Sequence, residues 1–293
     1  MVRRLQIAAP DGGRLDVEVA GPEDGTPVVF HTGTPSAGVL FDPGVAAGAE
    51  RGLFHVGYSR PGYGRSDRRP GRTVADCAPD VAAIADELGF ERFFTVGWSG
   101  GGPHALACAA LLPDRTIAAA TLGGVAPREA EGLDWLDGMG EENLEEFGAL
   151  DAGEEELQAY LEENGADLAG ASGPELHAAL GDLLSAVDQE ALTGEFADYL
   201  ARSVSEGLEH GLWGWLDDDL AFGRDWGFDL GAITRPALIW QGAHDRFVPF
   251  AHGEWLAAHV AGARPRLLAD HGHLSITLGS YDKVLDDLLA AGD

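Results

Sequence analysis

The chain has 293 residues, of which 45% are hydrophobic and 23% charged, so it can bury a sizeable core as one large domain or as a domain with an insertion. This composition excludes intrinsic disorder and a collagen-like repeat, and no run of about 18 apolar residues marks a membrane span. The 19 Lys and Arg against 49 Asp and Glu give a net charge of −30, which repels nucleic acids and anionic membrane surfaces, so neither is expected as a partner.

The first part of the chain alternates short apolar runs with turns and helical patterns. Strands are predicted at residues 5–8, 15–19, 28–31 and 53–57, and a helix at 74–88 that ends at Gly89. A strand at 93–97 leads through a glycine-rich turn into a helix at 103–112, and a further strand follows at 117–122. Strands that alternate with helices predict an α/β fold, with a mostly parallel central sheet and helices on both faces.

The character of the chain changes at residues 128–229. Apolar residues recur there at helical spacing among 28 acidic residues and three arginines, a net charge of −25, and no β-type run interrupts them. We predict an acidic helical cap, inserted into a core domain that comprises residues 1–127 and 230–293. In the second part of this core the alternation resumes, with strands predicted at 237–241 and 266–269 and helices at 253–260 and 281–290.

The N-terminal stretch bears on the location of the protein, and the cysteine content bears on disulfides and metal sites. Before Asp11 the N-terminal stretch lacks the apolar run of a secretory signal, so a cytoplasmic location is the default expectation. Cys77 and Cys108 are too few for a disulfide framework or a cysteine-ligated metal site, and both are predicted to be small core residues.

The sequence GWSGG at residues 97–101 matches the motif G-x-S-x-G between a buried strand and a helix. Such a turn exposes the serine, here Ser99, above the sheet, and glycines on both sides avoid a clash with the strand or the helix. The overlapping sequence GGGPHA at 100–105 also fits the dinucleotide fingerprint G-x-G-x-x-A. That alternative needs an acidic residue after the next strand, and LGGVA at 122–126 offers none, so a nucleophilic serine is favoured and no cofactor is expected.

A serine hydroxyl needs a base to remove its proton and an acid to orient that base. Asp245 and His273 follow the last two predicted strands, in the order serine, acid, histidine, and the carboxyl ends of such strands are where α/β folds bind ligands. His104, His244 and His271 are interpreted as structural or surface residues. The pair of His271 and His273 has no further ligand at suitable spacing, so no metal site is expected.

Two backbone donors should stabilise the oxyanion that forms during attack on a carbonyl. The first candidate is the N–H of Gly100. The second lies in HTGTPS at 31–36, where Gly33 permits close approach and the N–H of Thr34 can point inward, and the choice between these two neighbours stays open. Trp98, Trp213 and Trp215 are the candidate substrate contacts, although core packing is the more common role of such side chains.

Four motifs in this order resemble the α/β-hydrolase fold superfamily, in its capped, esterase-like serine hydrolase branch. Besides the serine motif they are HTGTP at 31–35, RPGYGRS at 60–66, which resembles the family's R-P-G-x-G-x-S loop, and GAHDRFVP at 242–249, which resembles its G-x-x-D-x-x-V-P loop. The resemblance covers nearly the whole chain outside the insertion. It implies that Ser99 is the nucleophile, His273 the base and then the acid, and Asp245 the orienting carboxylate.

From this resemblance we expect a serine hydrolase that cleaves a small-molecule carboxylic ester, or a related acyl compound such as a lactone, through an acyl-enzyme on Ser99. The family's dehalogenases and epoxide hydrolases use an aspartate at that position, which argues against both activities. A proline-iminopeptidase-like aminopeptidase and a C–C bond hydrolase are alternatives on the same triad. A ligand receptor with a silent triad is the alternative from outside the enzymes.

Overall fold

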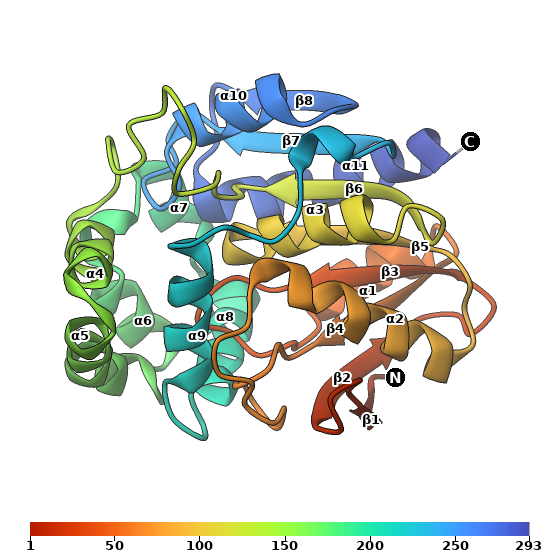
Figure 1. Cartoon of the computed structure of the whole chain (residues 1–293), viewed down its shortest axis with the longest axis horizontal. Helices are drawn as coiled ribbons and strands as arrows, with labels where there is room; N and C mark the ends of the chain where they lie inside the picture. Colours follow the sequence, from red (N-terminus) through yellow and green to blue (C-terminus); the bar gives the residue numbers. More distant parts are fainter. Residues whose placement is uncertain (293) are drawn as a thin grey trace.

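The computed structural model describes residues 1–292 and has an eight-stranded sheet at its centre (Figure 1). Its strands are β1 (Arg3–Ala8), β2 (Arg14–Ala20), β3 (Thr26–His31), β4 (Leu53–Tyr58), β5 (Phe93–Trp98), β6 (Thr116–Leu122), β7 (Ala237–Gly242) and β8 (Ala263–Leu268). The order is β1-β2-β4-β3-β5-β6-β7-β8, in which β2 runs antiparallel to β1 and β4 and all other neighbours are parallel. The predicted α/β fold with a mostly parallel sheet is confirmed.

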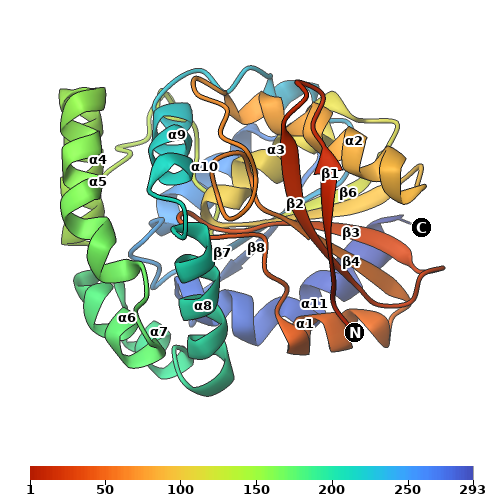
Figure 2. The same ribbon diagram turned by 90° about the horizontal axis from the view of Figure 1, so that it is seen from below.

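Helices cover both faces of the sheet (Figure 2). One face carries α1 (Asp42–Ala49) and α11 (His273–Gly292), and the other carries α2 (Cys77–Leu88), α3 (Gly102–Leu111) and α10 (Phe250–His259). Every residue of β5 and of β7 is buried. Because both faces are covered, these central strands are apolar along their length and do not alternate between apolar and polar residues.

All eight predicted strands form, and the predicted helices differ from the structure at two places. The sequence does not predict α1, because Gly44 and Gly48 lower its helix propensity. Close packing requires Gly48, since a Cβ there would overlap the His55 ring, and it favours Gly44, where a Cβ would lie 3.1 Å from the Tyr281 ring. Helix α11 begins at His273, well before the predicted start at residue 281.

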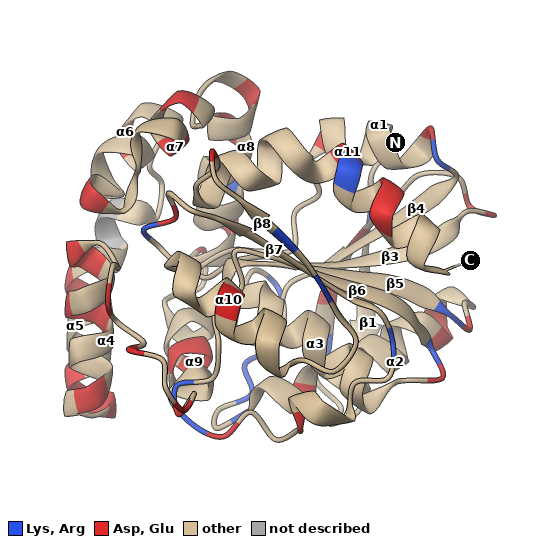
Figure 3. Ribbon diagram, turned by 90° about the horizontal axis from the view of Figure 1, so that it is seen from above, with Lys and Arg blue, Asp and Glu red and all other residues tan. Residues whose placement is uncertain are grey.

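The chain between β6 and β7 starts with loops and turns over residues 123–140 and is mainly helical from 141 to 222. Its helices are α4 (Glu141–Ala152), α5 (Glu154–Leu168), α6 (Gly173–Ala179), α7 (Ala186–Ala191), α8 (Gly194–Gly207) and α9 (Trp213–Phe222). They gather beside the carboxyl ends of the parallel strands (Figure 1), and acidic residues are dense on α4 and α5 (Figure 3). Within residues 1–292 no helix combines the length and the hydropathy needed to cross a membrane.

Candidate active site

Ser99 lies in a sharp turn between strand β5 and helix α3. Its φ of 55° is the one positive φ of a non-glycine residue within residues 1–292, a strain that persists only where the surrounding structure enforces it. Two glycines allow the turn, because a Cβ on Gly97 would overlap the carbonyl of Gly101, and a Cβ on Gly101 would overlap that of His31. The strand, turn and helix expected around the G-x-S-x-G motif are therefore present.

The structure brings His273 and Asp245 together. Nδ1 of His273 lies 2.8 Å from Oδ2 of Asp245, and both side chains are buried. Oδ1 of Asp245 accepts the backbone N–H groups of Phe247 at 3.0 Å and Val248 at 2.8 Å, and Gln241 donates to Oδ2 at 3.0 Å. Burial raises the pKa of Asp245, and the adjacent His273 opposes this shift. Because Nδ1 is bound to the carboxylate, Nε2 is the ring nitrogen left to receive a proton.

Asp188, on α7, fixes the backbone at which α11 begins. Its carboxylate accepts the backbone N–H groups of His273, Leu274 and Ser275, each at 2.9 Å, so it caps the helix that starts at the candidate base. A Cβ on Gly272 would overlap this carboxylate. Sequence reasoning missed Asp188, because the contact joins residues 85 positions apart and no local motif marks it.

The loop after β3 lies against the serine turn. A Cβ on Gly33 would lie 3.2 Å from Cβ of Ser99, and a Cβ on Gly100 would lie 2.5 Å from Oγ1 of Thr34 and 3.0 Å from the Phe222 ring. The peptide bond that follows Thr34 is cis. The structure thus gathers all three predicted oxyanion residues around Ser99, and which of Thr34 and Gly33 supplies the second donor stays a prediction.

A buried ion network holds this loop from the side of α9. Arg60 donates to the carbonyl of Thr32 at 2.6 Å and to Oγ1 of Thr34 at 3.2 Å. Asp218 accepts from Thr34 at 2.6 Å and from Arg60 at 3.2 Å, and it pairs with Arg72 at 2.7 Å. Although burial disfavours its charge, the two arginines hold the pKa of Asp218 far below its usual range. The sequence placed Arg60 in a family motif but gave no sign of Asp218 as its partner.

Comparison with known proteins identifies the family of this chain. Residues 26–279 match the family model described as alpha/beta hydrolase fold. The chain belongs to the α/β hydrolase fold family. The predicted resemblance is therefore confirmed at the level of the family.

Three proteins illustrate what this α/β hydrolase is similar to. A non-heme chloroperoxidase of Streptomyces lividans is 29% identical over 97% of this chain and 98% of its own length. A bifunctional esterase/perhydrolase of Acinetobacter calcoaceticus is 30% identical over 41% of this chain and 44% of its own length. The solved structure of an esterase from Exiguobacterium antarcticum has a TM-score of 0.67 and 22% identity, with 99% of each chain covered. The family supports a hydrolase, and the esterase structure shows the shared fold.

Two cavities of the α/β hydrolase are lined by Ser99. The smaller, of about 60 Å³, also includes His273 and apolar side chains such as Leu200 and Val204 of α8. The larger, of about 200 Å³, also includes Gly100 and acidic side chains from α4 and α9. The two cavities share Ser99, Thr34 and Phe247, so they adjoin each other at the serine turn.

The three candidate tryptophans occupy different places. Trp98 lines the smaller cavity, and its Nε1 donates to the carbonyl of His273 at 3.2 Å, while Trp215 lines the larger cavity. Trp213 is 36% exposed, stacks 4.3 Å from the guanidinium of Arg68 and lines a surface groove beside β1 and β2. Residues two apart on a helix point in nearly opposite directions, so α9 brings Trp215 to Ser99 and not Trp213.

The other histidines and the cysteines lie as follows. His104 is buried, its Nδ1 donates to the carbonyl of Gly100 at 2.9 Å, and burial lowers its pKa to about 3. His244 is exposed, and His271 is half-buried beside an exposed aspartate. Cys77 and Cys108 are buried free thiols. Among the described side chains, those of residues 1–165 and 168–292, no group of three or more His, Cys, Asp and Glu residues is arranged to hold a metal ion.

Proposed function

We propose that the protein is a serine hydrolase that cleaves a small carboxylic ester or a related acyl compound such as a lactone. The observation that carries this proposal is that Ser99, in its strained turn, shares a cavity of about 60 Å³ with His273, whose ring is bound to Asp245. A serine becomes nucleophilic when a neighbouring base takes its proton, and the base needs a third group to orient it.

In the proposed reaction, Oγ of Ser99 attacks the ester carbonyl while Nε2 of His273 takes its proton. The resulting oxyanion accepts hydrogen bonds from the N–H of Gly100 and from that of Thr34 or Gly33. Protonated His273 then gives its proton to the departing alcohol, which leaves an acyl-enzyme. Water loses a proton to His273, attacks the acyl carbon and releases the acid, and the proton returns to Ser99.

The size and lining of the smaller cavity favour a short acyl chain. A buried water needs about 10 to 15 Å³ of such volume, so 60 Å³ holds only a few groups of that size. Its apolar side chains on α8 suit an aliphatic group. Because α4, α8 and α9 contribute lining residues to the two cavities, we propose that residues 128–229 act as a cap that limits what reaches Ser99.

The test is labelling with a fluorophosphonate, followed by mass spectrometry, on the wild type and on Ser99→Ala. The probe needs an activated serine and little substrate fit, so we expect one labelled peptide that contains Ser99 and none in the variant. Label elsewhere, or no label on folded protein, contradicts the assignment and favours a ligand receptor. A panel of p-nitrophenyl esters, aminoacyl arylamides and cleavable diketones then separates the esterase from an aminopeptidase and a C–C bond hydrolase.

A second candidate activity is perhydrolysis of the same esters. The relatives named as a chloroperoxidase and as an esterase/perhydrolase favour it. In this reaction hydrogen peroxide replaces water in the attack on the acyl-enzyme, and the product is a peracid. Peracid formation from an acetate ester and peroxide, lost in Ser99→Ala, is the expected result; ester hydrolysis without peracid at high peroxide excludes this activity.

A further inference from the structure

The larger cavity beside Ser99 has an acidic wall. It is formed by Glu142 and Glu146 of α4 and Asp219 of α9. Asp219 is 1% exposed, yet neither its Oδ2 nor Oε2 of Glu142 accepts an N–H or O–H donor from the described side chains, those of residues 1–165 and 168–292. Buried carboxylate oxygens are normally satisfied, because an unpaired one costs free energy, so this wall is suited to accept hydrogen bonds from a ligand.

The described partners of these carboxyls include no cation. Glu146 accepts Nε1 of Trp215 at 2.8 Å, and its carboxyl is hydrogen-bonded to that of Asp219, a contact between two acids that needs a shared proton in place of a counter-charge. Burial raises the pKa of both carboxyls, and the charge of Glu146 adds to the shift at Asp219. Arg72, the arginine whose charge Asp219 feels, is already paired with Asp218 at 2.7 Å. Within the described residues no Lys or Arg lines the cavity, so the protein itself supplies no cation to this wall.

The acidic wall lies close to the reaction centre. Asp219 precedes Phe222 by one turn of α9, a rise of about 4.5 Å. The Phe222 ring packs against Gly100, the predicted oxyanion donor, at 3.0 Å from the position that a Cβ would take. The neighbouring Asp218 holds Thr34 of the oxyanion loop. A group bound to Asp219 therefore lies in the same cavity as Ser99.

We propose that this cavity is a subsite for a primary or secondary ammonium group, so that the esters cleaved by the protein carry a protonated amine near the scissile bond. An ammonium ion supplies both the positive charge and the N–H donors that the wall lacks. Aromatic side chains on the remaining sides, among them Tyr160 and Phe147, add favourable cation–π contacts. This inference rests on the function proposed for Ser99.

The first experiment compares matched substrates that differ by one group. The pairs are p-nitrophenyl 3-aminopropanoate with the butanoate, and 3-aminopropyl acetate with butyl acetate, in which NH₃⁺ replaces CH₃ in the acyl or in the alcohol half. Charge-assisted hydrogen bonds predict that kcat/KM is at least about tenfold higher for the ammonium member of one pair. In Asp219→Asn we expect this ratio to fall at least about tenfold.

The matched control is Glu145→Gln, which removes the same charge from an exposed position on the same helix as Glu146. We expect it to keep the wild-type ratio, because recognition in the cavity depends on contact. An equal fall in Asp219→Asn and Glu145→Gln would show that the long-range field of the acidic helices attracts cations, and it would overturn the subsite. A wild-type ratio near one, with normal cleavage of the neutral esters, would overturn it too.

A binding measurement separates this inference from the proposed catalysis. Ser99→Ala is titrated calorimetrically with propylammonium and with 1-propanol, which have similar shape and different charge. We expect propylammonium to bind at least about tenfold more tightly, and tetramethylammonium, which has no N–H, to bind less tightly than propylammonium. Tight propylammonium binding in a protein that fluorophosphonate does not label would keep the subsite and reject the hydrolase; equal binding of the amine and the alcohol would reject the subsite whatever the protein hydrolyses.

Discussion

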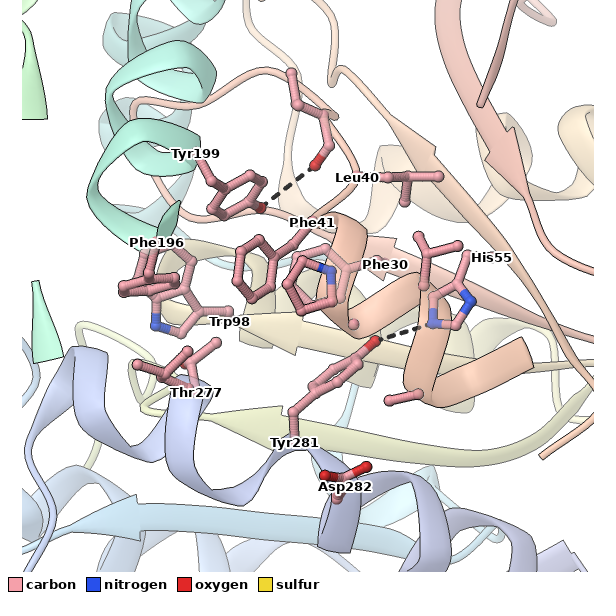
Figure 4. A pocket seen from close by; sticks show the side chains of 16 residues that line it. Phe30, Leu40, Phe41, His55, Trp98, Phe196, Tyr199, Thr277, Tyr281 and Asp282 are labelled. Carbon is pink, nitrogen blue, oxygen red and sulfur yellow. Dashed lines mark hydrogen bonds between the residues drawn. The ribbon is translucent and has the colours of Figure 1, made fainter. Parts of the chain in front are cut away.

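Trp98 lines two cavities. It lines the cavity of about 60 Å³ at Ser99 and also an apolar cavity of about 130 Å³ between α1, α8 and α11 (Figure 4). Helix α8 passes along both of these cavities, with Leu200 at the cavity beside Ser99 and Phe196 at the apolar cavity between α1, α8 and α11. We infer that the indole is the wall between them and sets the depth of the proposed acyl site.

Replacing this wall should change the preferred chain length. In Trp98→Ala the two cavities join, and each additional buried methylene contributes about 0.8 kcal/mol. We expect the ratio of kcat/KM for p-nitrophenyl octanoate over acetate to rise at least about tenfold. The control is Phe41→Ala, which enlarges only the apolar cavity of about 130 Å³ between α1, α8 and α11 and should keep the wild-type ratio. A folded Trp98→Ala protein with unchanged chain-length preference would contradict the role given to this indole.

Local sequence predicted some of these residues and not others. Ser99, Asp245 and His273 each sit in a short motif after a strand, and parallel strands bring their carboxyl ends to one edge, so their proximity followed from the pattern. Asp188 and Asp218 approach the site only through tertiary contacts, the latter across 184 positions to Thr34. Residues 128–229 contain 28 acidic residues, and nothing in the local sequence distinguishes the two that bind distant parts of the chain.

At the scale of elements, the start of α11 depends on Asp188. Residues 271–280, HGHLSITLGS, contain two glycines and a threonine of low helix propensity, so the sequence predicts a helix only from residue 281. The carboxylate of Asp188 satisfies three backbone N–H groups of the first turn and allows the helix to begin at His273. The same cause that made this boundary unpredictable also fixes the backbone of the candidate base.

Asp188→Ala should therefore affect both stability and turnover. Loss of the cap should lower the free energy of unfolding by about 1 to 2 kcal/mol, and the freed turn should lower kcat more than it changes KM. Denaturant unfolding and steady-state kinetics on p-nitrophenyl acetate measure the two effects. Glu190→Ala, at an exposed position of the same helix, is the control and should change neither. If kcat keeps its wild-type value in Asp188→Ala, the cap does not position His273.

Helix α9 carries Asp218, the second carboxylate that supports the site through contacts with distant residues. Asp218→Asn leaves Arg60 and Arg72 buried without their counter-charge, and breaking a buried pair in this way costs about 3 to 5 kcal/mol. Guanidinium unfolding should show this loss. Asp286→Asn removes a partner of Arg51 at an exposed position, where solvent screens the charges, and should leave the midpoint unchanged. Equal midpoints for Asp218→Asn and the wild type would mean that this network is not stabilising.

At the scale of the whole molecule, buried neutral histidines make stability depend on pH. Nδ1 of His252 accepts the N–H of Ala126 at 3.1 Å, Nε2 donates to the carbonyl of Trp135 at 2.8 Å, and burial lowers the pKa from 6.5 to about 4. Between these values the unfolded chain binds a proton that the folded protein does not. Its contribution to stability is therefore complete above pH 6.5 and declines by about 1.4 kcal/mol per pH unit on acidification.

His252→Gln isolates this contribution. The free energy of unfolding is measured in guanidinium at pH 7.5, 6.0 and 5.0. On acidification below pH 6.5 it should decline less steeply in the variant than in the wild type, with slopes that differ by about 1.4 kcal/mol per pH unit, the value for one proton. The Glu146–Asp219 pair shifts stability in the opposite direction, because its folded pKa values are raised and its protonated form is favoured by acid. Because both proteins contain the Glu146–Asp219 pair, its contribution cancels when the free energy of unfolding of the variant is subtracted from that of the wild type. Parallel pH dependences of the two proteins would show that His252 does not stay neutral when folded.

The attachments of Asp188 and Asp218 also bear on how such proteins can be recombined. Both carboxylates belong to the helical segment, and both reach groups of the sheet domain, one at the first turn of α11 and the other at the loop of Thr34. A chimaera that received residues 128–229 from a relative would gain a new pocket and lose the supports of the base and of the oxyanion loop. On the proposed role of residues 128–229 as a cap, we expect substrate range to be transplanted only together with the anchoring partners of this segment, Arg60 and Gly272 among them.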